Sequence, residues 1–221
     1  NDPWFRPVDC FQGPEGAVYV ADWHDKRAAH LDPVDNWDRT NGRIYKIVPK
    51  GFKEIPEFDL SKNSNSELIS LLSHKNIWYS REARRLLAER KDSTTFEPLK
   101  KIARSNQGAL ALEALWALAG AQNADPTFLQ ELLDHPTPAV REWSVRLLAD
   151  KRALSPIAIA KLTEMARTET NPTVASQIAC SARRLQPDAS LQITKALYSQ
   201  DQYIQDLYIP MLLWWAVEDQ S

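Results

Sequence analysis

The stretch "DHPTPAVREWSVRLLAD", residues 134–150, carries the strongest structural signal in this 221-residue chain. Its larger apolar residues recur at the spacing of one face of an α-helix. Pro138 stands near the start of this pattern, where a missing backbone N–H costs little. The stretch therefore predicts a helix whose apolar face must be covered by other parts of the chain.

The same pattern recurs along the chain, so repeats are expected. Shifted by 61 residues, His135 falls on His74, and the pair Leu147 and Leu148 falls on another Leu-Leu pair. The other long helices are expected within residues 74–90, 105–121, 171–185 and 201–217. Shorter helices that precede each of them are expected at residues 66–73, 96–103, 127–134, 157–166 and 190–198. Such helix pairs bury their apolar faces only by stacking on one another.

Residues 1–60 follow a different pattern, which is typical of β-strands. Three short runs rich in β-branched and aromatic residues alternate with turn signals, at residues 6–12, 17–23 and 42–49. Residues 56–60 could add an outer strand. Because three strands with a solvated edge make a poor core alone, we expect one β segment at 1–60 and a separate helical domain at 64–221, with about five helix pairs.

Both parts resemble known families. Residues 134–150 resemble the second helix of a HEAT repeat, with small residues, a Val-Arg step and a Leu-Leu pair. "WFRPVDCFQGPEGAVYVADWHD", residues 4–25, and "NGRIYKIVPKG", residues 41–51, resemble the closing blade of a six-bladed propeller of the glucose/sorbosone dehydrogenase type. Together they are similar to large bacterial membrane-bound dehydrogenases. The resemblance implies a mainly α fold: an α-α superhelix of HEAT-like repeats, preceded by a short β segment that corresponds to one propeller blade.

The resemblance also implies a function for the parent protein. That function is oxidation of a sugar or alcohol in the periplasm or at the cell envelope, with pyrroloquinoline quinone, calcium and haem c as cofactors. In this family a c-type cytochrome segment usually follows the helical repeats, but the chain contains no C-x-x-C-H motif. Its start, "NDPWFRPVD", reads like the middle of a domain. We therefore expect an inactive piece of such a protein that holds none of these cofactors itself.

The long connection between the second and third predicted strands is the main candidate for chemistry. A His beside carboxylates suits a general base, and clustered carboxylates suit calcium. The catalytic candidates are His24, His30 and Asp22, and the cofactor-binding candidates are Asp25, Asp35 and Asp38. The spacing matches no EF-hand, and a solvated loop with turn-forming Asp residues explains the same composition. No metal site is assigned.

Several other features limit the function. The net charge of −2 provides no basic surface for nucleic acid. The most apolar run, residues 208–217, has about half the length of a transmembrane helix. Cys10 and Cys180 form either one disulfide or two buried thiols, and we expect thiols. His74 and His135 share one repeat position, which indicates a role in turns rather than in metal binding.

The tryptophans indicate a binding surface at the C-terminal end. Trp116 and Trp143 lie among Leu and Ala and are expected in the core. Trp214 and Trp215 are adjacent on a predicted helix at 203–219, so they cannot both face one core. We expect this surface to contact the N-terminal β segment, a second copy or a following domain. Trp214 and Trp215 are therefore the candidate protein-interaction residues.

Three functions remain compatible with the sequence. The first is a non-catalytic scaffold that docks or spaces an electron-transfer partner of a quinoprotein-like dehydrogenase. The second is a general protein-binding repeat module without a redox role. The third is an enzyme fragment that binds a metal or a quinone through the acidic connection.

Overall fold

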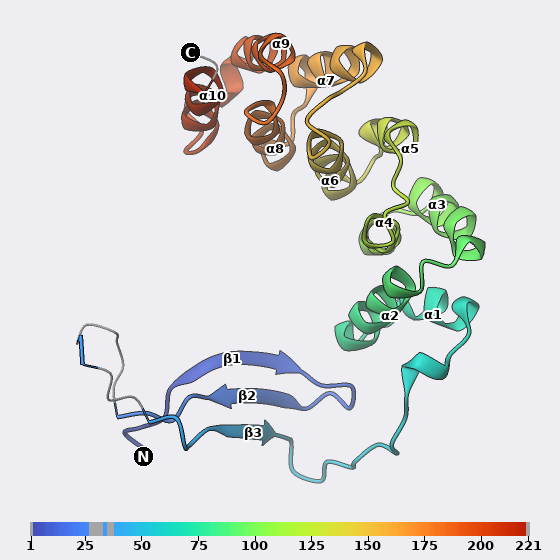
Figure 1. The fold of residues 1–221 in the computed structure, drawn as a ribbon, viewed down its shortest axis with the longest axis vertical. Coiled ribbons are helices and arrows are strands. Elements are labelled where there is room, and N and C mark those ends of the chain that lie inside the picture. The colour runs from blue at the N-terminus through green and yellow to red at the C-terminus, as the bar shows by residue number, and fades with distance from the viewer. Residues whose placement is uncertain (1, 27–32, 35–37, 220–221) are drawn as a thin grey trace.

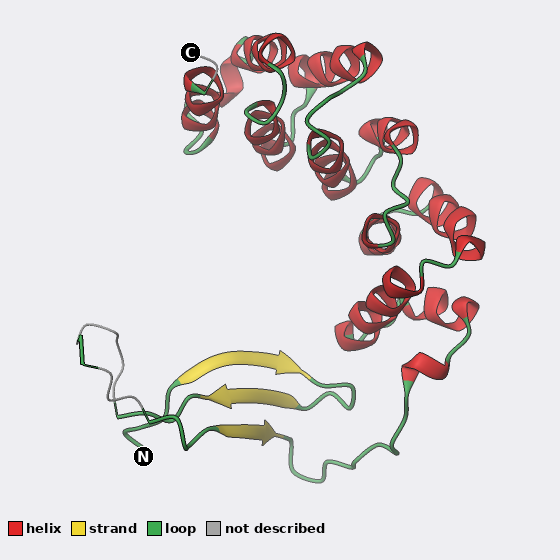
Figure 2. Ribbon diagram, viewed as in Figure 1, coloured by secondary structure: helices red, strands yellow, loops and turns green. Residues whose placement is uncertain are grey.

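The computed structural model describes residues 2–26, 33–34 and 38–219. This part of the chain contains ten α-helices and one three-stranded antiparallel sheet near the N-terminus (Figures 1 and 2). The expected fold class, mainly α with a short β segment in front, is thereby confirmed. The relation to HEAT repeats and to a propeller stays a prediction, as do the domain boundaries.

The sheet is a simple meander in the order β1-β2-β3. Its strands are β1 (Pro7–Gln12), β2 (Val18–Asp22) and β3 (Arg43–Ile47), and all three fall within the predicted runs. Both outer strands, β1 and β3, are exposed along their whole length. The sheet therefore buries little of its own apolar surface.

The outer strand suggested at residues 56–60 is wrong. These residues lie outside the sheet, and a short 3₁₀ helix begins at Leu60. Pro56 has no N–H to donate to a neighbouring strand. Phe58 packs edge-on against Trp78 of the first helix pair, with ring centroids 5.7 Å apart. Asp59 caps the 3₁₀ helix by accepting a hydrogen bond from the Ser61 amide at 2.9 Å.

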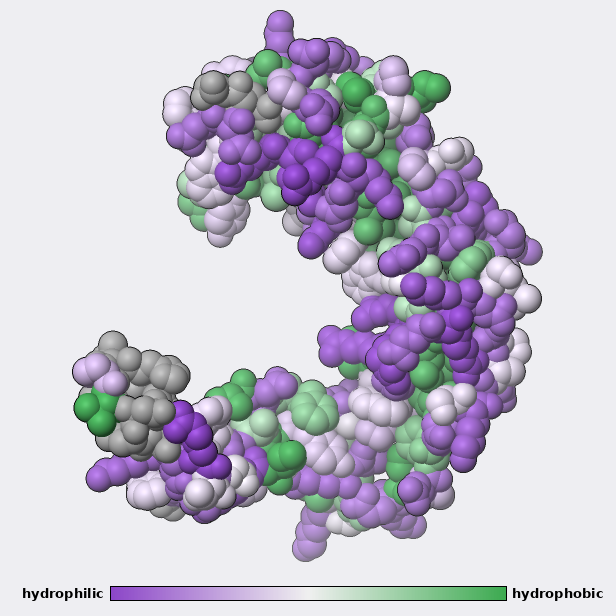
Figure 3. All heavy atoms as spheres, in the orientation of Figure 1, coloured by the Kyte–Doolittle hydropathy of each residue, from purple (hydrophilic) through white to green (hydrophobic). Residues whose placement is uncertain are grey.

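The ten helices form five pairs that stack into an arc (Figure 1). The outer helices are α1 (Asn65–Leu71), α3 (Phe96–Ser105), α5 (Pro126–Glu131), α7 (Pro156–Thr168) and α9 (Pro187–Tyr198). The inner helices are α2 (Ile77–Arg90), α4 (Ala109–Gly120), α6 (Pro138–Ala149), α8 (Pro172–Ala182) and α10 (Ile209–Glu218). Each inner helix contacts the next inner helix, from α2 through α10. The space-filling view shows the same arc as a body with a hollowed inner side (Figure 3).

A single apolar core runs through the array, because every pair contributes buried side chains to it. Representative members are Leu68, Leu87, Leu118, Leu148 and Ile178.

The helix starts are set by local chemistry. Each of the helices α5 to α10 carries a proline in its first turn, where the proline replaces an N–H that has no helical partner. No helix in the described part is long and apolar enough to cross a bilayer.

The last helix begins later than the predicted range of 203–219. Helix α10 starts at Ile209, and residues 201–203 form a separate 3₁₀ turn. A proline inside a helix removes one hydrogen bond and clashes with the preceding turn, so Pro210 forces a new start. Asp206 supplies the cap, accepting hydrogen bonds from the amides of Tyr208 and Ile209 at 2.9 Å each.

The sheet is joined to the array at the start of α2. Asn76 caps α2 with its side-chain oxygen, which accepts from the Trp78 amide at 2.9 Å. Its side-chain nitrogen donates to the carbonyls of Gly13 and Pro14 at 2.9 and 3.0 Å. One asparagine therefore holds both the first inner helix and the β1–β2 turn.

Candidate functional site

Two of the predicted site residues, Asp22 and His24, meet at the end of β2. The Asp22 side-chain oxygen Oδ1 accepts from the amides of Arg6 and His24, at 2.7 and 2.9 Å. This turn places His24 in a left-handed backbone conformation, with φ of 51°. Both side chains are buried. Strand β3 completes the group, because Arg43 lies opposite Asp22 in the β2–β3 register.

Arg43 determines which nitrogen of His24 carries the proton. Its Nη2 lies 2.9 Å from His24 Nε2, and a guanidinium can only donate. His24 Nε2 therefore accepts, and Nδ1 carries the hydrogen. Nδ1 lies 3.7 Å from Asp22 Oδ2 and 3.8 Å from Asp2 Oδ2, beyond the range of a hydrogen bond. Within the described residues, Nδ1 and Asp22 Oδ2 are both buried without a hydrogen-bond partner.

This arrangement is unsuited to base catalysis as it stands. A general base would need the lone pair of Nε2, and Arg43 already occupies it. The same guanidinium also donates to Asp2 Oδ2 at 2.8 Å. The group is therefore an ordered polar network that ties the N-terminal segment to the ends of β2 and β3.

The cofactor-binding candidates are used as turn and cap residues where they are described. Asp25 Oδ2 accepts from the Asp38 amide at 3.0 Å. Hydrogen bonds from Thr40 and Asn41 lower the pKa of Asp38 to about 2. No group of three or more His, Cys, Asp or Glu among the described residues is placed to hold a metal ion. The calcium that the resemblance implies stays an expectation.

Two further candidates, His30 and Asp35, lie outside the described residues.

The repeat-position histidines serve as turn residues, as expected. The Asn76 amide donates to His74 Nδ1 at 3.0 Å, and the Thr137 amide donates to His135 Nδ1 at 3.1 Å. The same bond therefore recurs two repeats apart.

The cysteines are a different case. Cys10 and Cys180 are both free thiols and both exposed. The expectation of burial is wrong, because Cys10 lies on the exposed strand β1 and Cys180 points away from the buried face of α8.

Trp214 and Trp215 are both exposed at the end of the array, by 63% and 38% of their surface. The buried stripe of α10 is made by Ile209, Leu213 and Ala216 instead. Figure 1 places α10 at the opposite end of the arc from the sheet. The expected contact with the N-terminal β segment is therefore wrong, while the expected exposure of at least one tryptophan is confirmed.

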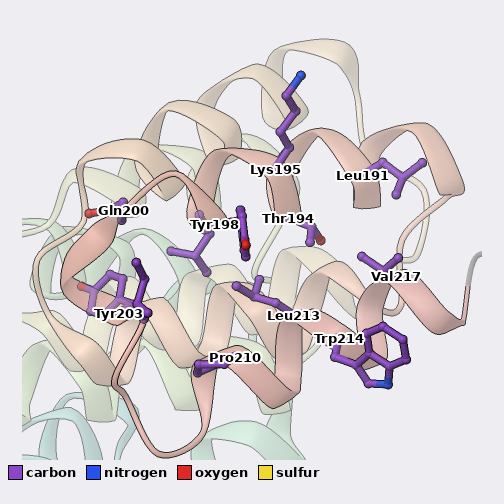
Figure 4. Close-up of a pocket in the computed structure, with 12 residues that line it drawn as sticks. Leu191, Thr194, Lys195, Tyr198, Gln200, Tyr203, Pro210, Leu213, Trp214 and Val217 are labelled. Carbon is purple, nitrogen blue, oxygen red and sulfur yellow. The ribbon is translucent and has the colours of Figure 1, made fainter.

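Trp214 lines an apolar groove that we call the terminal groove. It lies between α9, the 3₁₀ turn at 201–203 and α10, with a volume of about 590 Å³ (Figure 4). Its apolar walls are Leu191 and Tyr198 from α9, Ile204 from the connection, and Pro210, Trp214 and Val217 from α10. Trp215 is not part of it. At helical spacing Trp215 shares a different exposed face of α10 with Tyr208 and Met211.

A second aromatic feature runs along the inner helices, and we call it the Arg–Trp ladder. The Arg84 guanidinium lies 4.8 Å above the Trp116 ring, and the Arg146 guanidinium lies 4.9 Å above the Trp143 ring. The two indoles meet edge to face, with centroids 5.2 Å apart. The four side chains join α2, α4 and α6, and both tryptophans are half-buried. Trp143 packs against the apolar core, and the Trp116 Nε1 is buried. The two tryptophans therefore lie at the edge of the core and not at its centre.

Comparison with known proteins finds a family that matches the N-terminal part of the chain. A family model described as a domain of unknown function, DUF7133, matches residues 1–51. This range covers the sheet and the Asp22–His24 group. No curated protein and no solved structure matches the chain.

Proposed function

We propose that this chain is a docking scaffold, whose row of inner helices holds a protein partner. The Arg–Trp ladder is the observation that carries this proposal. It joins four large, at least partly exposed side chains from three successive inner helices by direct contacts. The resemblance to membrane-bound dehydrogenases adds that the partner is an electron-transfer protein.

The composition of the ladder supports a role in binding. Trp and Arg are the residues that most often dominate the free energy of protein interfaces. Here they are already ordered by contacts with one another, so little side-chain entropy is lost when a partner binds. Arg84 is fixed further by its ion pair with Glu113, at 2.8 Å.

The curvature of the array supports the same role. Stacked helix pairs create an extended concave surface that no single helix offers, and the chain has such a hollowed inner side (Figure 3). Helix α10 belongs to the same inner row and contributes Tyr208, Met211 and Trp215, which are exposed. Large exposed apolar side chains grouped in this way are typical of interaction surfaces.

The test uses a purified c-type cytochrome as the probe. We expect it to bind the immobilised chain, and we expect the double variant Trp116→Ala/Trp143→Ala to bind at least ~30-fold more weakly, as for interface hot spots. Ile157→Ala is the control, because this apolar residue is exposed on the outer helix α7 and lies outside both the ladder and the terminal groove. Equal binding by the double variant would refute docking on the ladder. Absence of any cytochrome binding would refute the electron-transfer role.

A further inference from the structure

We propose that the terminal groove binds a second copy of this chain, so that two arrays associate end to end through their α9 and α10 helices. This surface is separate from the Arg–Trp ladder, and the inference goes beyond the proposed docking of a partner. Three observations carry it: the stacking of the array, the charges beside the groove and the size of its apolar surface.

The stacking shows what kind of element fits the groove. Helix α7 is covered by α9, and α8 is covered by both α9 and α10. Within the described residues α10 contacts only elements that precede it. The groove is formed by α9 and α10, which are the last helix pair of the array. An amphipathic helix of the kind already present in the array therefore fits there, packed ridge into groove.

The charges of α9 favour a second copy that runs antiparallel. Leu191 and Tyr198 form its exposed apolar stripe, and Asp188 and Lys195 lie beside that stripe. Because Asp188 and Lys195 are seven residues apart, they lie on the same side of the helix. An antiparallel two-fold pairing brings Lys195 of each copy toward Asp188 of the other. Neither residue has an ion-pair partner in the described part of the chain.

In a parallel two-fold pairing the flanks that carry Asp188 and Lys195 lie on opposite sides of the helix pair, so the two charges do not meet. The antiparallel arrangement is also isologous, so it closes as a dimer and does not continue as a filament.

The side chains around the terminal groove expose a large apolar surface. The exposed fractions of Leu191, Tyr198, Ile204, Trp214 and Val217 are 46%, 76%, 57%, 63% and 41%. With roughly 150–250 Å² per large side chain, these five present ~600 Å². A standard interface buries about 800 Å² per partner, of which about 57% is apolar. These side chains therefore contribute to the apolar area that such an interface needs.

The experiment measures the mass of the whole chain in solution by sedimentation velocity over a wide range of concentration. We expect a reversible dimer. We expect Trp214→Asp to raise the dimer dissociation constant at least ~100-fold, because each dimer loses two central anchors. Trp215→Asp is the matched control: it places the same change on the same helix outside the groove, and it should stay dimeric. Circular dichroism confirms that both variants are folded.

A charge swap keeps the test independent of folding effects at Trp214. Lys195→Asp alone should weaken the dimer, because two acidic residues then meet across the two-fold axis. The double variant Asp188→Lys/Lys195→Asp should restore it, because the opposite charges are exchanged. A monomer at every concentration overturns the proposal, as does a Trp214→Asp dimer of unchanged stability or a swap that does not restore association. None of these outcomes affects cytochrome binding on the ladder, which is measured separately.

Discussion

The buried carboxylate of Glu169 connects α6 to the start of α8, because it accepts hydrogen bonds from both. Arg141 donates to both carboxylate oxygens at 2.8 Å each, and the Asn171 amide donates at 2.8 Å. Burial raises the pKa of Glu169, but the hydrogen bonds from Arg141 and Asn171 and the Arg141 charge lower it further, so the net pKa lies below its ordinary value. The stabilisation is therefore present above the unfolded pKa of about 4.3 and is lost as the pH falls through the folded value.

Glu113 provides the opposite case in the same array. Burial raises its pKa, and the charge and hydrogen bond of Arg84 only partly oppose this, so the net pKa is raised. Its contribution is therefore present below the unfolded pKa and is lost as the pH rises through the folded value.

These two residues give a paired prediction. Glu169→Gln should lower the free energy of unfolding by about 1.5–3 kcal/mol at neutral pH, the range for hydrogen bonds to charged groups. This deficit should shrink in acid, where the wild-type carboxylate is protonated as well. Glu113→Gln should leave stability unchanged or raise it. Urea unfolding followed by circular dichroism at the two pH values measures both. Equal losses in the two variants would contradict the sign of the pKa shifts.

His24 gives a prediction about activity. Because Arg43 donates to its Nε2 at 2.9 Å, we expect no oxidation of alcohols or sugars by this chain, with or without pyrroloquinoline quinone. Dye reduction against a buffer blank is the measurement. Reduction above that blank which disappears in His24→Ala would contradict this prediction and favour an enzyme fragment.

At the scale of elements, helix periodicity was a good guide to which segments form helices, and a poor guide to where they begin. The repeated apolar spacing reports faces that are buried by stacking, and it located all ten helices of the described part. The starts depend on single caps, such as Asp206 before α10. Pro210 was a visible signal for that start, but the apolar residues around it concealed it.

The candidate sites depend on pairings that periodicity does not report. Asp22 and His24 are close in sequence, so their meeting could be predicted. The place of Arg43 beside them depends on the β2–β3 register, which a connection of about twenty residues leaves open. The Arg–Trp ladder depends on the rotation of α4 relative to α2 and α6. Residue types alone cannot give that rotation, so the sequence predicts a core position for Trp116 and Trp143 but not their contacts with arginines at the edge of the core.

Stacking of the helix pairs predicts how far a core substitution lowers local stability. At the end of the array the loss should stay near the substituted helix, and at the centre it should reach helices on both sides. Leu118 of α4 and Ile209 of α10 are both fully buried. Replacing either by Ala should cost about 2–5 kcal/mol of local stability. Because each pair contacts only its neighbours, Ile209→Ala should speed amide exchange only in α8, α9 and α10, which contact one another. Leu118→Ala should speed exchange in helices on both sides of α4. Hydrogen-exchange mass spectrometry distinguishes the two, and uniform protection loss in both would contradict a repeat-like array.

At the scale of the whole molecule, the sheet and the array differ in how they are stabilised. The helices share one continuous core. The sheet instead leaves Val8, Ile44 and Ile47 exposed. Its two outer strands have free edges in the described part of the chain, which natural proteins usually cover or shorten. That the β segment belongs to a larger sheet structure stays a prediction.

This difference leads to a prediction about the boundary between the two parts. Lys50 and Lys53 lie in an exposed segment that is neither strand nor helix. Trypsin should therefore cleave after one of them before it cleaves within the array, since local stability controls access. The helical product should keep its helical circular dichroism and its urea midpoint, because the core of the array contains no residue of the sheet. Mass spectrometry identifies the first cut. A helical product that unfolds at clearly lower urea would show that the sheet stabilises the array through Asn76 and the β1–β2 turn, and that the two parts fold as one.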